Sequence, residues 1–194
     1  MDLTSQSQLH IILGPMFAGK STYLINKIND LLTTQTIQVG ELITINHSSD
    51  SRYDIDKICS HDGFKIDCKT FNNLNDAYNN LIETDAWDKI KVIFIDESQF
   101  FNDLYDFVKT TLITTNKQIY IAGLDGDFKQ ESFKNSKILD LIPWATSITK
   151  LNSKCYICQN TAPYTKRLTN ISNQTILVGG SETYQPVCIN HLNN

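Results

Sequence analysis

Residues Gly14 to Ser21 read GPMFAGKS and match the pattern G-x-x-x-x-G-K-[ST] in full. The apolar run at residues 9–13 predicts a buried strand before them, and apolar residues at helical spacing predict a helix over residues 20–32. In this context the glycines let the backbone wrap around phosphates, while the loop amides and the helix N-terminus supply donors and partial positive charge. The stretch predicts a nucleoside triphosphate site; the alternative is a glycine turn that matches by chance.

The sequence on either side of this loop alternates between strand and helix patterns. Further strands are predicted at residues 37–45, 91–95 and 118–122, and further helices at 74–84, 102–112 and 138–141, the last ending before Pro143. This alternation is typical of a mostly parallel sheet with helices on both faces, so we expect an α/β, P-loop (RecA-like) fold. Polar residues 46–67 predict a long loop with room for a hairpin, and a loop of that length is more often functional than idle.

A pair of acidic residues ends one of the predicted strands. Residues 91–95 (KVIFI) run directly into Asp96 and Glu97, a Walker B pattern, at the strand end where such sheets bind ligands. Asp96 is expected to act through a Mg²⁺ shell together with the Ser21 hydroxyl. Glu97 could take a proton from an attacking hydroxyl, which is typically worth about 10²–10⁴-fold in rate. The alternative is a pair of solvated acids at the start of the next helix.

The last forty residues carry a different signal. Cys155-x-x-Cys158 is followed by Cys188-x-x-His191, and each pair has the spacing of a zinc knuckle. Four protein ligands leave no open coordination position, so the sequence predicts a structural zinc rather than a catalytic one. We therefore expect a P-loop domain at residues 1–150 and a small zinc-binding lasso, or lid, at 151–194. The alternative is three ordinary buried cysteines and a surface histidine.

Composition excludes several classes of protein. Hydrophobic residues make up 41% of the chain and charged residues 20%, as in a soluble globular protein. The net charge of −4 argues against nucleic acid as a partner. Apolar runs are too short for a membrane span, and the polar start does not read as a signal peptide, so we expect a cytoplasmic protein without a membrane partner. Five cysteines without an export signal argue against a disulfide framework, and Cys59 and Cys68 are read as ordinary thiols.

Taken together, these motifs resemble those of the cellular-type (type II) thymidine kinases. GPMFAGKST, the DSRY and CSHD stretches, FIDESQFF, GLDGDF, PYTKRL, VGG and the C-x-x-C…C-x-x-H tail occur in the family's order. The resemblance covers about residues 10 to 191. It implies an enzyme that transfers the γ-phosphoryl group of ATP to the 5′-hydroxyl of thymidine, giving dTMP, with Glu97 as the base. It also implies Mg²⁺, one structural zinc per chain, a homotetramer and inhibition by dTTP.

The resemblance assigns roles position by position. The phosphates of ATP are assigned to Gly14, Pro15, Met16, Phe17, Ala18, Gly19, Lys20, Ser21, Asp50, Ser51, Arg52, Asp96, Glu97, Ser98 and Gln99. Thymidine is assigned to Phe101, Leu124, Phe128, Thr175, Ile176, Leu177, Val178, Gly179 and Tyr184. Zinc is assigned to Cys155, Cys158, Cys188 and His191, and Mg²⁺ to Ser21 and Asp96. Met16 and Phe133 are further candidates for the thymine pocket.

The sequence departs from the family at three positions. His191 stands where many relatives carry Cys, Ser98 follows Glu97 at a usually small position, and Ser132 precedes Phe133 where Pro is frequent. Without the resemblance, Phe101, Phe128 and Phe133 would be read as core residues. Two other functions fit the phosphate loop alone, namely a P-loop ATPase or switch with a partner-binding zinc knuckle, and a nucleotide-binding protein without catalysis.

Overall fold

A six-stranded sheet forms the centre of the computed structural model, which describes residues 6–50, 57–59, 65–168 and 179–193. Its strands are β1 (Gln8–Leu13), β2 (Leu42–His47), β5 (Lys69–Phe71), β6 (Val92–Ile95), β7 (Gln118–Gly123) and β8 (Ser147–Lys150). They lie in the order β5-β2-β6-β7-β1-β8, and every neighbouring pair is parallel. The expected α/β fold with a parallel sheet is confirmed.

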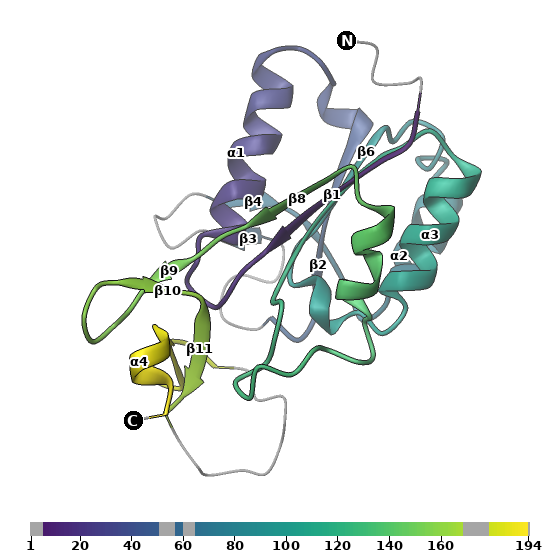
Figure 1. Ribbon diagram of the computed structural model, residues 1–194. Helices are drawn as coiled ribbons and strands as arrows, with labels where there is room; N and C mark the ends of the chain where they lie inside the picture. Colours follow the sequence, from purple (N-terminus) through teal and green to yellow (C-terminus); the bar gives the residue numbers. More distant parts are fainter. Residues whose placement is uncertain (1–5, 51–56, 60–64, 169–178, 194) are drawn as a thin grey trace.

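Helices cover both faces of this sheet (Figure 1). On one face α1 (Lys20–Thr33) buries Leu24 and Ile28 against Ile12 and Phe94. On the other face α2 (Leu74–Glu83), α3 (Leu104–Thr114) and the 3₁₀ helix η3 (Ile138–Trp144) pack on the opposite side chains of the same strands. Because successive strand residues point to opposite faces, a strand buried on both sides must be apolar throughout, as β6 with the sequence VIFI is.

The carboxyl ends of the parallel strands meet along one edge of the sheet. The phosphate loop follows β1, Asp96 and Glu97 follow β6, and the loop from Leu124 to Phe128 follows β7. Since β1 pairs with β7 and β7 pairs with β6, these three segments are neighbours at that edge. The sheet thus brings together residues about a hundred positions apart in the sequence.

Smaller elements complete the described part of the chain. Within the predicted loop 46–67, β3 (Lys57–Cys59) and β4 (Lys65–Asp67) pair as the expected hairpin. After the sheet, β9 (Ser153–Lys154) pairs with β10 (Thr161–Ala162), and β11 (Tyr164–Arg167) pairs with β12 (Tyr184–Val187) before the short helix α4 (Ile189–Leu192). Figure 1 shows the described residues of this C-terminal segment, 151–168 and 179–193, beyond the carboxyl edge of the sheet. None of the described helices is both long and apolar enough to span a membrane.

The structure corrects two of the expected elements and adds two strands. The strand predicted at residues 37–45 begins only at Leu42, because Val39–Glu41 form the 3₁₀ helix η1, closed by a capping box between Gln38 and Glu41. The helix predicted to stop before Pro143 is the 3₁₀ helix η3, which continues through Pro143 to Trp144. Strands β5 and β8 were not predicted; they form the two edges of the sheet and are short.

Candidate functional site

The phosphate loop lies between the end of β1 and the first turn of α1. Gly19 caps the helix with φ +82°, a left-handed conformation that glycine adopts without strain. The Lys20 ammonium group curls back over the loop and donates to the Pro15 carbonyl oxygen at 2.8 Å. The geometry places a cation and a helix N-terminus around one concave stretch of backbone, which suits a polyphosphate.

Asp96 lies beside this loop, at the end of β6. The Ser21 hydroxyl hydrogen-bonds to its carboxylate, and the Lys20 charge is close enough to act on it. Burial, together with the negative charge of Glu97, raises the pKa of Asp96 to about 6 despite these two favourable contacts. The hydroxyl and carboxylate oxygens of Ser21 and Asp96 are hard ligands of the kind that Mg²⁺ prefers, so the residues present fit the expected cation.

Glu97 is held by its neighbours in an unusual conformation. Its φ of 48° is left-handed, and its backbone N–H donates to the Asp96 carboxylate at 2.9 Å. The buried side chain of Gln99 donates from Nε2 to Glu97 Oε2 at 2.6 Å, and its Oε1 accepts from the Leu124 backbone N–H at 3.0 Å. The Gln99 carboxamide therefore fixes the Glu97 carboxylate relative to the loop that follows β7.

The other predicted nucleoside residues fall into two groups. Phe128 is half-buried and Tyr184 is almost fully buried, and both contact the guanidinium group of Arg167. Phe101, by contrast, is fully buried in the core between the sheet and helices α2 and α3. Its ring meets the His47 ring edge-on, with ring centroids 4.7 Å apart. The structure thus gives Phe101 the core position that its residue type alone suggests, and its role toward thymidine stays a prediction.

Several predicted residues lie outside the described part of the chain. These are Ser51, Arg52, Thr175, Ile176, Leu177 and Val178. The predicted residues that border them, Asp50 and Gly179, are described. Asp50 accepts from the Asn46 side chain at 3.2 Å, just after β2, and Gly179 precedes the turn into β12.

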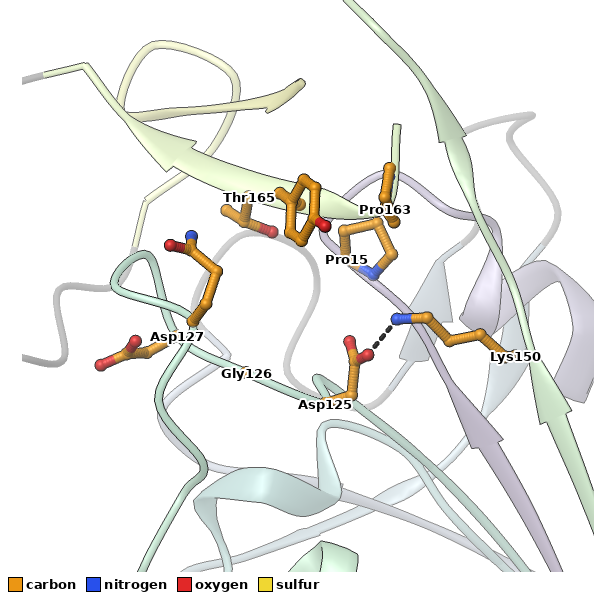
Figure 2. Close-up of a pocket in the computed structure, with 9 residues that line it drawn as sticks. Pro15, Asp125, Gly126, Asp127, Lys150, Pro163 and Thr165 are labelled. Atoms are coloured by element: carbon orange, nitrogen blue, oxygen red, sulfur yellow. Dashed lines mark hydrogen bonds and ion pairs between the residues drawn. The ribbon is translucent and has the colours of Figure 1, made fainter. Parts of the chain in front are cut away.

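A cavity of about 280 Å³ lies between the phosphate loop, the loop after β7 and strand β11. Figure 2 shows Asp125 and Lys150 joined by an ion pair on one side of it, with Pro15, Pro163 and Thr165 on another. Thr165 also joins the two parts of the chain, because its hydroxyl accepts from the Met16 backbone N–H at 2.9 Å. None of the predicted nucleoside residues that the structure describes lines this cavity, although Gly126 and Asp127 in its wall lie between Leu124 and Phe128.

The four predicted zinc ligands come together at the far end of the C-terminal segment. The ligand atoms of Cys155, Cys158, Cys188 and His191 all lie within 4.8 Å of one another. The Cys188 sulfur is 3.3 Å from His191 Nδ1, the Cys155 sulfur is 3.5 Å from it, and the sulfurs of Cys158 and Cys188 are 3.7 Å apart. A tetrahedral zinc with Zn–S of about 2.3 Å and Zn–N of about 2.0 Å needs ligand separations of roughly 3.5–3.8 Å.

The thiol chemistry of this cluster also suits a metal. Burial acts to raise the pKa of Cys155, but backbone N–H groups, first that of Cys158, donate to its sulfur and outweigh burial. The net result is a pKa lowered to about 5, so the thiolate that zinc requires is the stable form at neutral pH. The cluster fits a structural zinc.

Four residues at the site were not assigned individual roles from sequence. Lys150 has an ordinary polar side chain that no local pattern marks, whereas Asp125 lies in the quoted GLDGDF stretch and Thr165 in PYTKRL. Arg167 belongs to the quoted PYTKRL stretch, so the only available signal was its place in a family motif. The contact of Gln99 with Glu97 depends on the backbone turn after β6, which the sequence does not reveal.

Comparison with known proteins gives a consistent picture. A family model described as thymidine kinase matches residues 7–192. A thymidine kinase of Oryza sativa subsp. japonica is 40% identical over 184 residues, which are 95% of this chain and 65% of the rice protein. One from Choristoneura fumiferana entomopoxvirus is 42% identical over 93% of both chains. The cytosolic thymidine kinase of Gallus gallus is 33% identical over 94% of this chain and 75% of its own. The chain therefore spans just under two thirds of the rice protein and nearly all of the viral one.

Proposed function

The chain belongs to the thymidine kinase family, and from this premise we propose that it transfers the γ-phosphoryl group of ATP to the 5′-hydroxyl of thymidine, giving dTMP. The observation that carries the proposal is the meeting of Lys20, Ser21, Asp96 and Glu97 at one edge of the sheet. A phosphate loop with an acidic strand end fits a phosphoryl donor, and the family supplies the acceptor.

Each residue contributes by position and charge. The loop from Gly14 to Ser21 binds the triphosphate, and Lys20 leaves the Pro15 carbonyl to contact its outer phosphates. Ser21 and Asp96 would hold Mg²⁺, which when bound neutralises charge on the phosphates. Asp50, Ser51, Arg52, Ser98 and Gln99 belong to the same proposed phosphate side.

Glu97 is proposed as the general base. Gln99 fixes the Glu97 carboxylate on the side of the loop after β7, where the carboxylate would accept the proton of the 5′-hydroxyl as that oxygen attacks the γ-phosphorus. Leu124, Phe128, Tyr184, Phe101 and residues 175–179 would hold the nucleoside. Closure of residues 151–194 over the site as a separate lid domain would keep water out and so limit ATP hydrolysis.

The resemblance supports three further parts of the proposal. The enzyme is expected to be a homotetramer, to be cytoplasmic like the relative named cytosolic, and to be inhibited by dTTP. dTTP carries both the base of the acceptor and a triphosphate, so it could fill both halves of the site at once.

The test is Glu97→Gln in the full chain. This change keeps the size of the side chain and removes the base, so kcat for dTMP formation should fall about a hundredfold or more while both KM values change little. Product is measured by chromatography, and ATP hydrolysis is measured with and without thymidine. Wild-type hydrolysis that is equal in both cases, with no dTMP formed, would favour an ATPase or switch; retained kcat in the variant would remove Glu97 from its role.

A further inference from the structure

Arg167 lies between two aromatic rings that come from different parts of the chain. Its guanidinium carbon is 3.9 Å from the centre of the Phe128 ring, in the loop after β7, and 5.4 Å from the centre of the Tyr184 ring, at the start of β12. One of its N–H groups also donates to the Tyr184 hydroxyl at 2.8 Å. Among the cation–ring contacts of the described residues, the contact with Phe128 is the shortest.

The strand pairing explains why Arg167 reaches both rings. Arg167 and Tyr184 are directly opposite each other in the antiparallel pair β11–β12, so their side chains share a face of that hairpin. Thr165, two residues earlier, points to the same face and accepts from the Met16 backbone N–H. This face of β11 therefore contacts the phosphate loop through Thr165 and the loop after β7 through Arg167.

A guanidinium group is suited to this double contact in a way that an ammonium group is not. It is planar, so its face can stack on Phe128 while its edge donates to the Tyr184 hydroxyl. Both rings are partly or fully removed from water, which strengthens a cation–π contact relative to one at the surface. Lys129 provides a comparison, because its ammonium group lies 5.6 Å from the centre of the same Phe128 ring but its side chain is exposed.

We propose that Arg167 is a positioning residue for the nucleoside, which fastens Tyr184 of the C-terminal segment to Phe128 of the P-loop domain. This rests on the proposed function, in which both rings border the nucleoside. Since the guanidinium occupies one face of Phe128 at van der Waals distance, a thymine ring meets Phe128 by its edge or its other face. Arg167 thereby sets the separation of the two aromatic walls without touching the phosphates.

Steady-state kinetics of the full chain test the proposal with Arg167→Met and Arg167→Lys. Both variants lose the planar stack and the bond to Tyr184, so KM for thymidine should rise about tenfold, while kcat and KM for ATP stay within about twofold. Lysine should not rescue the effect, since charge alone does not replace the guanidinium. Lys129→Met, which removes an exposed cation near the same ring, should leave all three constants unchanged.

Two further measurements separate positioning from a general structural role. Tyr184→Phe should add little to the effect of Arg167→Met, because Arg167→Met already breaks the hydrogen bond that Tyr184→Phe removes, and each variant should keep the zinc content of the wild type. Hydrogen exchange of the peptide covering Tyr184–Val187 should be faster in Arg167→Met.

An unchanged thymidine KM, rescue by lysine, or a parallel loss of kcat, ATP affinity and zinc would overturn the proposal. A wild-type protein that makes no dTMP would instead contradict the proposed function, and the exchange experiment would still report on the contact.

Discussion

Asp96 binds its proton more tightly in the folded protein than an ordinary carboxyl group does. Its pKa is about 6, because burial and the charge of Glu97 outweigh the contacts with Ser21 and Lys20. In the unfolded chain the value is about 3.9, so between about pH 4 and 6 the folded state holds a proton that the unfolded state has released. Stability must therefore fall as pH rises through this window.

Asp96→Asn removes this titration and gives the corresponding prediction. Between pH 5 and 7.5, without Mg²⁺, the wild type should lose roughly 1 kcal/mol of unfolding free energy relative to the variant. Urea unfolding at both pH values measures this difference, and titrating groups that do not interact with Asp96 cancel. A difference that does not change with pH would show that the pKa of Asp96 is not raised. The variant should also lose kinase activity at any pH, since it lacks the proposed ligand for Mg²⁺.

At the scale of elements, the turn after β6 packs tightly against the end of β7. A methyl group added at Gly123 would lie 2.6 Å from the Ser98 hydroxyl, 2.6 Å from Ile138 and 2.9 Å from Gln99 Oε1. The Ser98 hydroxyl already donates to the Ala122 carbonyl oxygen at 2.7 Å, and Gln99 holds both Glu97 and Leu124, so these atoms have little freedom to move.

Gly123→Ala should therefore destabilise the protein by about 1–3 kcal/mol, the usual cost of overpacking. It should also lower kcat, with a smaller change in KM for ATP, because the Gln99 carboxamide that fixes Glu97 must shift. Gly40→Ala is the matched control, since an added methyl group there has no atom within 4 Å. Thermal unfolding and initial rates measure both effects. Equal stability of the two variants would contradict the packing argument.

The elements that sequence predicted well are those whose pattern is set by burial on the sheet. Strands β6 and β7 are buried along their whole length, β1 is buried from Ile11 to Leu13, and α1 and α2 carry regular apolar stripes. Edge strand β8 has the sequence SITK and is largely exposed, so neither an apolar run nor alternation marks it. Its pairing with β1 is a tertiary contact that becomes visible only once the sheet is assembled.

At the scale of the whole molecule, the candidate site was predictable where one short segment carries the chemistry. The phosphate loop, the Asp96–Glu97 pair and the two halves of the zinc cluster are local motifs, and the structure brings the members of each together. Three other contacts join residues that lie far apart in the chain. They are Arg167 with Phe128, Thr165 with Met16, and Lys150 with Asp125. Such contacts depend on how the strands and the C-terminal segment assemble, which no local pattern specifies.

Zinc is expected to hold this C-terminal segment together. The cluster core is small, with Cys155, Ala162, Val187 and Cys188 as its buried residues in the described part of the chain, and a core of that size cannot order a segment alone. Zinc would tie the β9–β10 end to α4 and close the chain between Cys158 and Cys188, which contains Arg167, Tyr184 and residues 175–179. Loss of the metal should thus affect the nucleoside side of the site before the phosphate side.

Elemental analysis should find about one zinc per chain, and Cys155→Ser should lower this value sharply. The variant should unfold about 5–10 °C below the wild type and bind thymidine at least tenfold more weakly, while KM for ATP changes little. Ile157→Ser is the matched control, because Ile157 lies in the same knuckle with an exposed side chain and contributes only its backbone N–H to the Cys155 sulfur. It should keep the metal and full thymidine affinity. Metal-free protein with unchanged thymidine affinity would show that the segment reaches its active form without zinc, because the contacts through Thr165 and Arg167 would then be sufficient to hold it.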